Sequence, residues 1–373
     1  MTESPRFPER YAILTINDPA NYGNRLQNYA LVKLLENYGA VTTIKFPTYD
    51  CKGISKLKLG LKNLKKTWFG ASLYEFTGGY RALEGKRLKN SVEFSKRYTP
   101  DNDVALSLSR GLRCKRDVSV SKIVIGSDQV WNYNWVLPDE LRFRLGTFKR
   151  DIPAISYAAS IGVSTIDEEF IPAFREGMSG LEFVSVREDK GAEILHDATG
   201  KDVTVVLDPT MMIEAGQWRS LFRGFVDPSD QYVLTYFLGK PTAEQKSVIQ
   251  QYADKLGLRI RRILDTTDPE TYVAGPQDFV ELFAKADFVF TDSYHACCFS
   301  ALFHVGFKVF SRSGFNGKDA MNSRMDTLFR ELGLSTTVTD DLAVAQIDYE
   351  QVDKELEKQR RKSREWLEKA LSY

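Results

Sequence analysis

Cysteine and histidine are scarce in this chain, and their scarcity excludes whole classes of site. The 373 residues contain four cysteines and three histidines. The cysteines show no CxxC spacing, so the sequence indicates neither a zinc site nor a disulfide framework. Cys297 and Cys298 are adjacent in an apolar stretch and are expected to be small core residues. The sequence therefore predicts a protein without a metal centre, in a reducing compartment.

Long apolar runs and an excess of charge are also absent. No apolar run approaches the roughly 18 residues that a membrane span needs. The N-terminal residues are polar and lack the apolar region of a secretory signal. A formal net charge of +1 argues against a nucleic-acid-binding body. With 43% hydrophobic and 27% charged residues, we expect a folded, cytoplasmic protein that does not bind nucleic acid.

Strand-like and helix-like segments alternate along the chain, which predicts an α/β fold with two domains. The first series occupies residues 1–215, with an inserted helical excursion at about residues 50–115. After a stretch rich in turn signals, a second series runs through residues 216–348. A charged amphipathic helix at residues 349–373 is expected to cross back to the first domain. The loop after the first strand is expected at residues 17–24, before a helix that begins at about residue 26. It lacks GxGxxG, so a dinucleotide fingerprint is absent.

The segment at residues 52–66 is basic, with lysines set among leucine and isoleucine. Two interpretations remain open for it. A helix with a solvated charged face would have this composition, and so would a peripheral contact with an anionic membrane surface.

Small or polar residues follow the strands of the first domain, at the point where each strand ends. If the strands are parallel, these exits lie along one edge of the sheet, where ligands bind in open α/β folds. Tight turns are the alternative for each exit taken alone. The residues concerned are Asn21, Gly23, Asn24, Gly126, Ser127, Asp128, Ser160, Arg187 and Asp208.

The most informative stretch of the second domain is residues 287–310, which predicts a strand–helix–strand unit. The first strand is expected at residues 288–291, a compact apolar helix at 296–303 and the second strand at 307–310. His295 falls where the first strand gives way to the helix. This position is again the carboxyl edge of a parallel sheet.

The start of that helix has the features of an anion site. Asp292 and Ser293 are acceptable N-cap residues, and the first helical amides can hold a phosphate or carboxylate. His295 would stand beside that site, whereas His196 and His304 are expected to be structural. A structural role for His295 itself is the alternative, because a lone histidine near a helix start often has one.

Several short motifs, in this order, resemble the polysaccharide pyruvyl transferase family over most of the chain. The resemblance implies two Rossmann-like domains that face a cleft, similar to the GT-B glycosyltransferases. The motifs are Asn21-Tyr22-Gly23-Asn24, GSDQVWN at residues 126–132, SYAASIG at 156–162, SVRED around Arg187, LDP at 207–209 and TDSYHA at 291–296.

The resemblance also implies an activity. Members of the family move a pyruvyl group from phosphoenolpyruvate onto a sugar, form a pyruvate ketal and release phosphate, without a cofactor. By resemblance, Arg187 contacts the donor's phosphate or carboxylate and His295 is the general acid. The family often has arginine at the position of Ser293. Whether Arg312, Lys318 or Arg324 supplies the missing charge is left open.

The expected reaction is therefore pyruvyl transfer to a sugar of an extracellular or capsular polysaccharide precursor. The acceptor saccharide is either free or lipid-linked. Two other functions remain as alternatives: a GT-B nucleotide-sugar glycosyltransferase, and a non-catalytic saccharide-binding protein. A proton delivered by His295 to the enol carbon of phosphoenolpyruvate would make the neighbouring carbon electrophilic, and free imidazole titrates near neutral pH.

Overall fold

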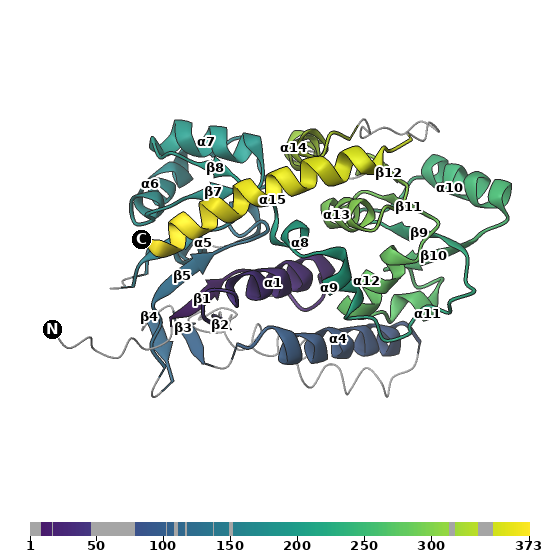
Figure 1. The fold of residues 1–373 in the computed structure, drawn as a ribbon, viewed down its shortest axis with the longest axis horizontal. Helices are drawn as coiled ribbons and strands as arrows, with labels where there is room; N and C mark the ends of the chain where they lie inside the picture. The colour runs from purple at the N-terminus through teal and green to yellow at the C-terminus, as the bar shows by residue number, and fades with distance from the viewer. Residues whose placement is uncertain are drawn as a thin grey trace. The chain divides into compact units, whose positions relative to one another are not determined.

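The chain forms two compact units in the computed structural model (Figure 1). Unit 1 comprises Met1–Asn63, Ser95–Met212 and Arg360–Tyr373, and unit 2 comprises Leu64–Phe94 and Ile213–Gln359. The basic segment at residues 52–66 lies outside the described part of the chain. The structure describes residues 9–16, 18–45, 79–101, 103–107, 111–115, 118–136, 138–148, 152–312, 318–334 and 346–373.

Unit 1 contains a four-stranded parallel sheet in the order β2-β1-β5-β6. Two short parallel strands, β7 and β8, pair with each other, and a bridge from Ala159 to Val186 continues the parallel arrangement from the exit of β6. The strands are β1 (Arg10–Leu14), β2 (Ala40–Thr43), β5 (Lys122–Ile125), β6 (Ala154–Ser156), β7 (Ser185–Val186) and β8 (Thr204–Val205). Their carboxyl ends therefore share one edge, as expected from the sequence.

The apolar composition of these strands explains why they lie at the centre of the unit. Residues 11–14 and 122–125 are buried without interruption, as is typical of parallel strands covered by helices on both faces. The helices of this unit are α1 (Tyr22–Leu35), α5 (Pro138–Arg144), α6 (Ile171–Ser179), α7 (Asp189–Thr199) and α8 (Pro209–Met212), with 3-10 turns at Tyr133–Trp135 and Glu168–Phe170. An antiparallel hairpin of β3 (Val104–Ser107) and β4 (Gly111–Cys114) was not expected from the sequence.

Unit 2 contains a second four-stranded parallel sheet, in the order β10-β9-β11-β12. The strand order reverses between β9 and β11, and ligands bind at such switch points in open α/β sheets. The strands are β9 (Tyr232–Tyr236), β10 (Arg259–Ile263), β11 (Phe288–Thr291) and β12 (Phe307–Val309). The helices are α9 (Ala215–Arg219), α10 (Ala243–Leu256), α11 (Pro269–Tyr272), α12 (Pro276–Ala284), α13 (Tyr294–Leu302) and α14 (Lys318–Glu331). The predicted α/β class with two Rossmann-like units is confirmed.

Two long helices, α4 (Gly79–Tyr98) and α15 (Tyr349–Ser372), contribute residues to both units. Within unit 2, α4 is held by a hydrogen bond from Asn90 Nδ2 to the Val273 carbonyl (2.8 Å) and by Arg87 over the ring of Tyr272. These contacts explain why α4 groups with unit 2 as far as Phe94, whereas the sequence analysis placed the inserted excursion in the first domain.

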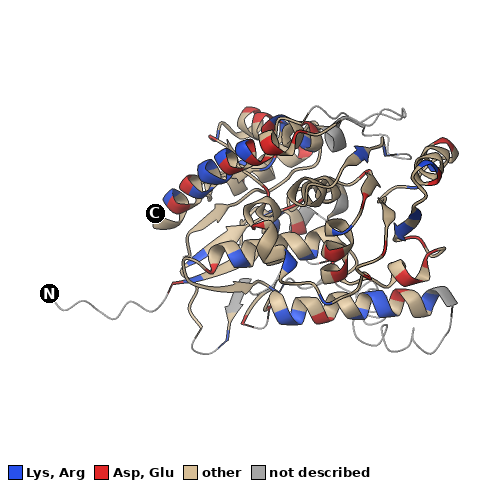
Figure 2. Cartoon of the chain, turned by 45° about the vertical axis from the view of Figure 1, so that its right-hand side comes forward, with Lys and Arg blue, Asp and Glu red and all other residues tan. Residues whose placement is uncertain are grey.

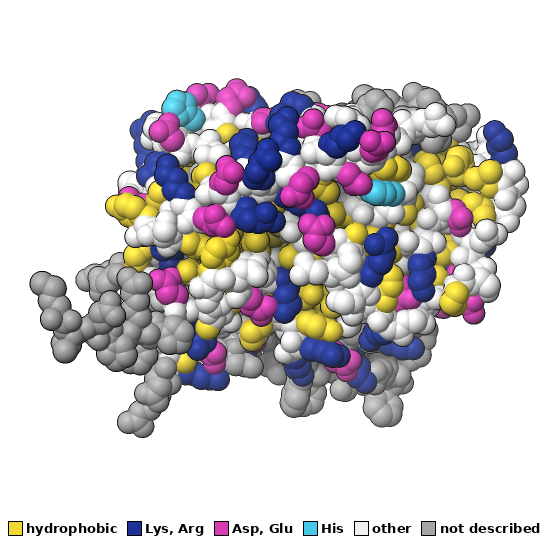
Figure 3. Space-filling view, viewed as in Figure 1, with side chains coloured by type: hydrophobic (Ala, Val, Ile, Leu, Met, Phe, Trp, Pro, Cys, Tyr) yellow, Lys and Arg dark blue, Asp and Glu magenta, His cyan; other side chains and the backbone are white. Residues whose placement is uncertain are grey.

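The C-terminal part of α15 packs on unit 1. Lys122 Nζ donates hydrogen bonds to the carbonyls of Ala370 and Leu371 at 2.8 Å each, and Ser363 Oγ accepts from the Leu207 amide at 3.0 Å. Basic and acidic residues alternate along the rest of the helix (Figure 2), and side chains of both signs lie over it in the space-filling view (Figure 3).

Candidate active site

Arg187 is the centre of the polar network at the carboxyl edge of the sheet in unit 1. Its Nη1 donates to Asp208 Oδ2 at 2.6 Å, and its Nη2 donates to Asp128 Oδ1 at 2.5 Å. The side chain of Arg187 is fully buried. The exits of β5, β7 and β8 are therefore tied together by one guanidinium, whose planar fork suits two carboxylates at once.

A second residue at the exit of β5 and the start of α1, which follows β1, join the same network. Ser127 Oγ donates to Asp208 Oδ2 at 3.1 Å, and Asn24 Nδ2 donates to Asp128 Oδ2. Asn21 is the N-cap of α1, where its side chain accepts from the Asn24 amide at 3.2 Å. The predicted convergence of these exits on one edge is thus observed as direct side-chain contact.

The start of α1 differs from the sequence-based expectation. We expected a loop through residue 24 and a helix from about residue 26, but α1 begins at Tyr22. Gly23 and Asn24 therefore lie in the first helical turn and are buried. The cap by Asn21 satisfies one of the amides that a helix start leaves without an acceptor, which allows the earlier start.

The backbone conformation at position 126 and the atoms around it both require glycine. Its φ of 135° is one that residues with a side chain rarely adopt. A Cβ atom at this position would lie 2.1 Å from the carbonyl oxygen of Tyr157. The close approach of the two backbones at the exits of β5 and β6 allows the parallel bridge between Asp128 and Ala159.

Ser160 and Glu188 complete the edge. Glu188 Oε1 accepts from Ser160 Oγ at 2.8 Å and from the Ile161 amide at 3.0 Å, and Glu188 Oε2 lies 3.9 Å from Arg187 Nε. Sequence reasoning missed Glu188, although it directly follows Arg187. It also missed Gln27, whose Oε1 accepts from the Ser127 amide at 3.0 Å, because a glutamine inside an amphipathic helix carries no signal of its own.

The charge of this network bears on the expected role of Arg187. One guanidinium faces the carboxylates of Asp128, Asp208 and Glu188, all of them buried. In this conformation the cation is already neutralised and its surroundings are acidic. The geometry therefore assigns Arg187 the task of ordering the strand exits, and its contact with an anionic donor stays a prediction.

His295 lies in the first turn of α13, directly after β11 and at the switch point of unit 2. Ser293 is the N-cap residue, but its side chain makes no capping hydrogen bond. The Ser293 amide donates instead to Thr291 Oγ1 at 3.0 Å, which fixes the turn between strand and helix. His295 is 7% exposed, and its ring meets the ring of Tyr294 edge to face, with 5.4 Å between the ring centroids.

Asp292 fastens the loop after β9 to the start of α13. Its carboxylate accepts from the amides of Leu238 (2.7 Å) and Gly239 (2.8 Å), and from Arg312 Nε at 3.0 Å. Arg312 Nη2 also donates to the carbonyl of Asp292 at 2.9 Å. Asp292 therefore connects two strand exits, and Arg312 neutralises its carboxylate beside His295.

Three basic residues were candidates to supply the positive charge that Ser293 lacks, and they lie at different positions in the structure. Arg312 contacts the residue before Ser293, as described above. Arg324 is buried on α14, a helix that packs against α13. The side chain of Lys318 lies outside the described part of the structure. Arg312 has two hydrogen bonds to the motif itself, both to Asp292.

Among the described residues, no helix has the length and apolar character to cross a membrane. A family model described as "Polysaccharide pyruvyl transferase" matches residues 21–314 of the chain. A comparison of the chain with curated proteins found no match.

Solved structures with a similar course of the chain include two UDP-GlcNAc 2-epimerases. The one from Neisseria meningitidis, bound to UDP-GlcNAc, is 10% identical with a TM-score of 0.42, and covers 97% of this chain and 99% of its own. The one from Rickettsia bellii is 7% identical with a TM-score of 0.45, and covers 98% of this chain and 97% of its own. The E. coli heptosyltransferase WaaC with ADP is 10% identical with a TM-score of 0.39, and covers 94% of this chain and 99% of its own.

Proposed function

Because the chain belongs to the polysaccharide pyruvyl transferase family, we propose that it transfers a pyruvyl group from phosphoenolpyruvate to a sugar of an extracellular or capsular polysaccharide precursor. The observation that carries the proposal is the position of His295 in the first turn of α13, at the switch point of a parallel sheet. We place the reaction in the cytoplasm, with no cofactor besides the donor substrate.

The proposed reaction makes two bonds to the central carbon of the donor. His295 delivers a proton to the enol carbon, so that the CH₂ group becomes a methyl group and the central carbon becomes electrophilic. One sugar hydroxyl attacks that carbon. A second hydroxyl then replaces the phosphate, whose bond to the central carbon breaks. Each of the two sugar hydroxyls loses one proton. One proton is equivalent to the proton gained by the methyl group, and the other leaves with phosphate.

The protein contributes to this reaction at two points in unit 2. A positioned general acid accelerates a reaction by roughly 10²–10⁴, which corresponds to about 3–5 kcal/mol of activation free energy. The amides in the first turn of α13 offer an anion site, because a helix N-terminus binds phosphate or carboxylate. Arg312, paired with Asp292, offsets the negative charge of that carboxylate beside the turn.

The test measures inorganic phosphate released from phosphoenolpyruvate across a panel of galactose- and glucose-terminated acceptors. We compare the wild-type protein with His295→Gln and with the control His304→Gln. His304 is an exposed histidine of the same unit, and its Nε2 lies 2.9 Å from Asp353 Oδ1. Circular dichroism and calorimetric binding of phosphoenolpyruvate show whether each variant remains folded and retains the donor.

We expect acceptor-dependent phosphate release from the wild type and the control, and a loss of about 10²–10⁴ in His295→Gln with donor binding retained. Near-normal turnover by a folded His295→Gln protein would remove the general-acid assignment. Acceptor-dependent turnover of a nucleotide sugar without any release of phosphate from phosphoenolpyruvate would overturn the proposed function itself.

A further inference from the structure

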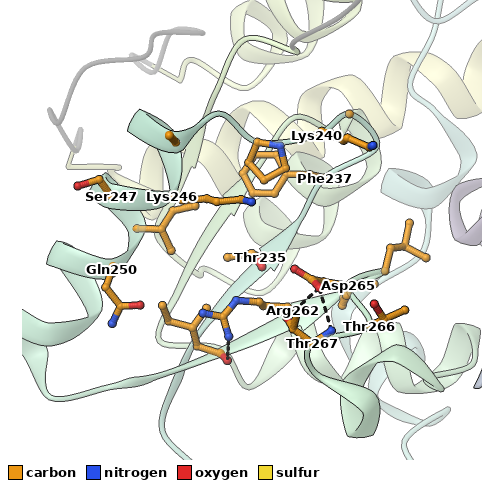
Figure 4. Close-up of a pocket in the computed structure, with 17 residues that line it drawn as sticks. Thr235, Phe237, Lys240, Lys246, Ser247, Gln250, Arg262, Asp265, Thr266 and Thr267 are labelled. Carbon is orange, nitrogen blue, oxygen red and sulfur yellow. Dashed lines mark hydrogen bonds between the residues drawn. The ribbon is translucent and has the colours of Figure 1, made fainter. Parts of the chain in front are cut away.

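A pocket of about 1120 Å³ lies at the carboxyl ends of β9 and β10 in unit 2 (Figure 4). Three segments line it: the loop that follows β9, the first turns of α10, and the end of β10 with the turn after it. All three belong to one compact unit. The functional site described above uses the other side of β9, where Asp292 and His295 follow β11.

The charged side chains that line the pocket are mostly basic. Lys240, Lys246 and Arg262 line it together with one carboxylate, that of Asp265. Asp265 is engaged in its own turn, where its Oδ1 accepts from the amide of Thr267 at 2.9 Å and from the hydroxyl of Thr267 at 2.8 Å. The pocket therefore has an excess of positive charge.

Lys246 and Arg262 extend into the pocket from opposite walls, one from α10 and the other from β10 (Figure 4). In the part of the chain that the structure describes, neither side chain forms an ion pair with a carboxylate. The guanidinium of Arg262 donates one hydrogen bond, to the Ile260 carbonyl at 3.3 Å. Both cations are thus available to an anionic ligand, and phosphate is the anion that lysine and arginine commonly bind together.

The rest of the lining suits a ligand with a sugar beside its phosphate groups. Hydroxyl groups come from Thr235, Ser247 and Thr266, and Phe237 offers an aromatic ring. The volume of about 1120 Å³ lies slightly above the roughly 300–1,000 Å³ typical of small-molecule sites. A three-carbon donor with one phosphate would leave most of this space empty, whereas a sugar diphosphate would occupy much of it.

The pocket is also connected to the loop beside His295. Gly239 lines the pocket, and its amide donates to Asp292 Oδ2 at 2.8 Å, three residues before His295. A ligand held by Lys246 and Arg262 would therefore lie next to the loop that Asp292 fixes. We propose that this pocket binds the diphosphate group of a glycosyl diphosphate that serves as the acceptor, an inference that rests on the proposed pyruvyl transfer to a saccharide.

The experiment is calorimetric titration of the full chain with inorganic pyrophosphate at about 0.1 M salt. We compare the wild type with Lys246→Gln, Arg262→Gln and the double variant. Lys255→Gln is the matched control, because Lys255 is an exposed lysine on the same helix that does not line the pocket. A second titration adds pyrophosphate in the presence of saturating phosphoenolpyruvate.

We expect each pocket variant to weaken pyrophosphate binding by about tenfold or more, and Lys255→Gln to change it by less than about twofold. Phosphoenolpyruvate should leave the pyrophosphate affinity unchanged. Equal affinity in the wild type and the double variant would overturn the proposal, as would the absence of binding. Displacement by phosphoenolpyruvate, with a matching loss of donor affinity in Lys246→Gln, would assign the pocket to the donor and overturn the acceptor assignment.

These outcomes are separable from a failure of the proposed function, because pyrophosphate binding requires no turnover. His295→Gln should bind pyrophosphate as the wild type does, whether or not phosphoenolpyruvate is its substrate. A wild-type protein that binds pyrophosphate through Lys246 and Arg262 but never releases phosphate from phosphoenolpyruvate would retain the pocket and lose the reaction.

Discussion

Replacement of Arg187 by lysine separates two roles that the residue could have. Lysine keeps the positive charge but carries a single ammonium group in place of the planar fork. In the structure the two terminal nitrogens of Arg187 bond to Asp208 at 2.6 Å and to Asp128 at 2.5 Å. One ammonium group cannot reproduce both contacts, so one buried carboxylate loses its cation.

The size of the effect follows from burial. A hydrogen bond to a charged group contributes about 1.5–3 kcal/mol, and breaking a buried ion pair costs about 3–5 kcal/mol. Because Arg187→Lys retains one of the two pairs, we expect a loss of about 3 kcal/mol in the free energy of unfolding. With a typical dependence on denaturant, the urea midpoint should fall by about 1–2 M.

The assay is urea unfolding followed by far-ultraviolet circular dichroism, in the absence of any substrate. Arg175→Lys is the matched control, because Arg175 is an exposed arginine of unit 1 whose Nε donates to the Ala198 carbonyl at 2.8 Å. We expect its midpoint to change little, since exposed substitutions usually stay within about 0.5 kcal/mol.

If Arg187→Lys unfolded at the wild-type midpoint while its affinity for phosphoenolpyruvate fell tenfold, the guanidinium would be a donor ligand rather than the tie between strand exits. The lysine variant would then have lost only the paired hydrogen bonds of the guanidinium to the substrate.

Two further predictions concern stability. Gly126→Ala should lower the free energy of unfolding by more than about 2 kcal/mol, because the added Cβ would lie 2.1 Å from the carbonyl oxygen of Tyr157. Gly216→Ala is the control, because a Cβ at that position has nothing within 4 Å. Equal melting temperatures of the two variants would contradict this prediction. Burial alone would raise the pKa of Glu281, but hydrogen bonds from Lys285 and from backbone amides bring it below its ordinary value of 4.5. The stability that Glu281 provides is thus present above pH 4.5 and is lost as the pH falls through the lower pKa of the folded state. Glu281→Gln should therefore reduce the difference between the urea midpoints measured at pH 7 and at pH 3. A difference equal to that of the wild type would count against this prediction.

Much of the sheet could be predicted because the central strands are short apolar runs bounded by polar residues. The predicted strand at residues 288–291 coincides with β11. The hairpin of β3 and β4 was missed, since its short strands lack a clear apolar alternation. The early start of α1 was missed because NYGN has the composition of a turn, whereas burial of that first turn favours a helix.

The candidate site was predictable in position but not in pairing. Repeated small and polar residues at strand exits indicated one functional edge, and His295 at the start of a helix indicated a second. The partners of Arg187 could not be predicted, because they depend on which strands are neighbours in the sheet. The pocket at β9 and β10 was also missed, since Lys246 and Arg262 belong to ordinary amphipathic and strand patterns and converge only in the fold.

The most direct test of the proposed chemistry is turnover of phosphoenolpyruvate and an acceptor sugar in D₂O, with the product analysed by mass spectrometry and proton NMR. Protonation of the enol carbon predicts a ketal whose methyl group carries one deuterium from the solvent, with one phosphate released for each ketal formed. A product that contains no ketal, or a ketal whose methyl group carries no solvent deuterium, would contradict the account.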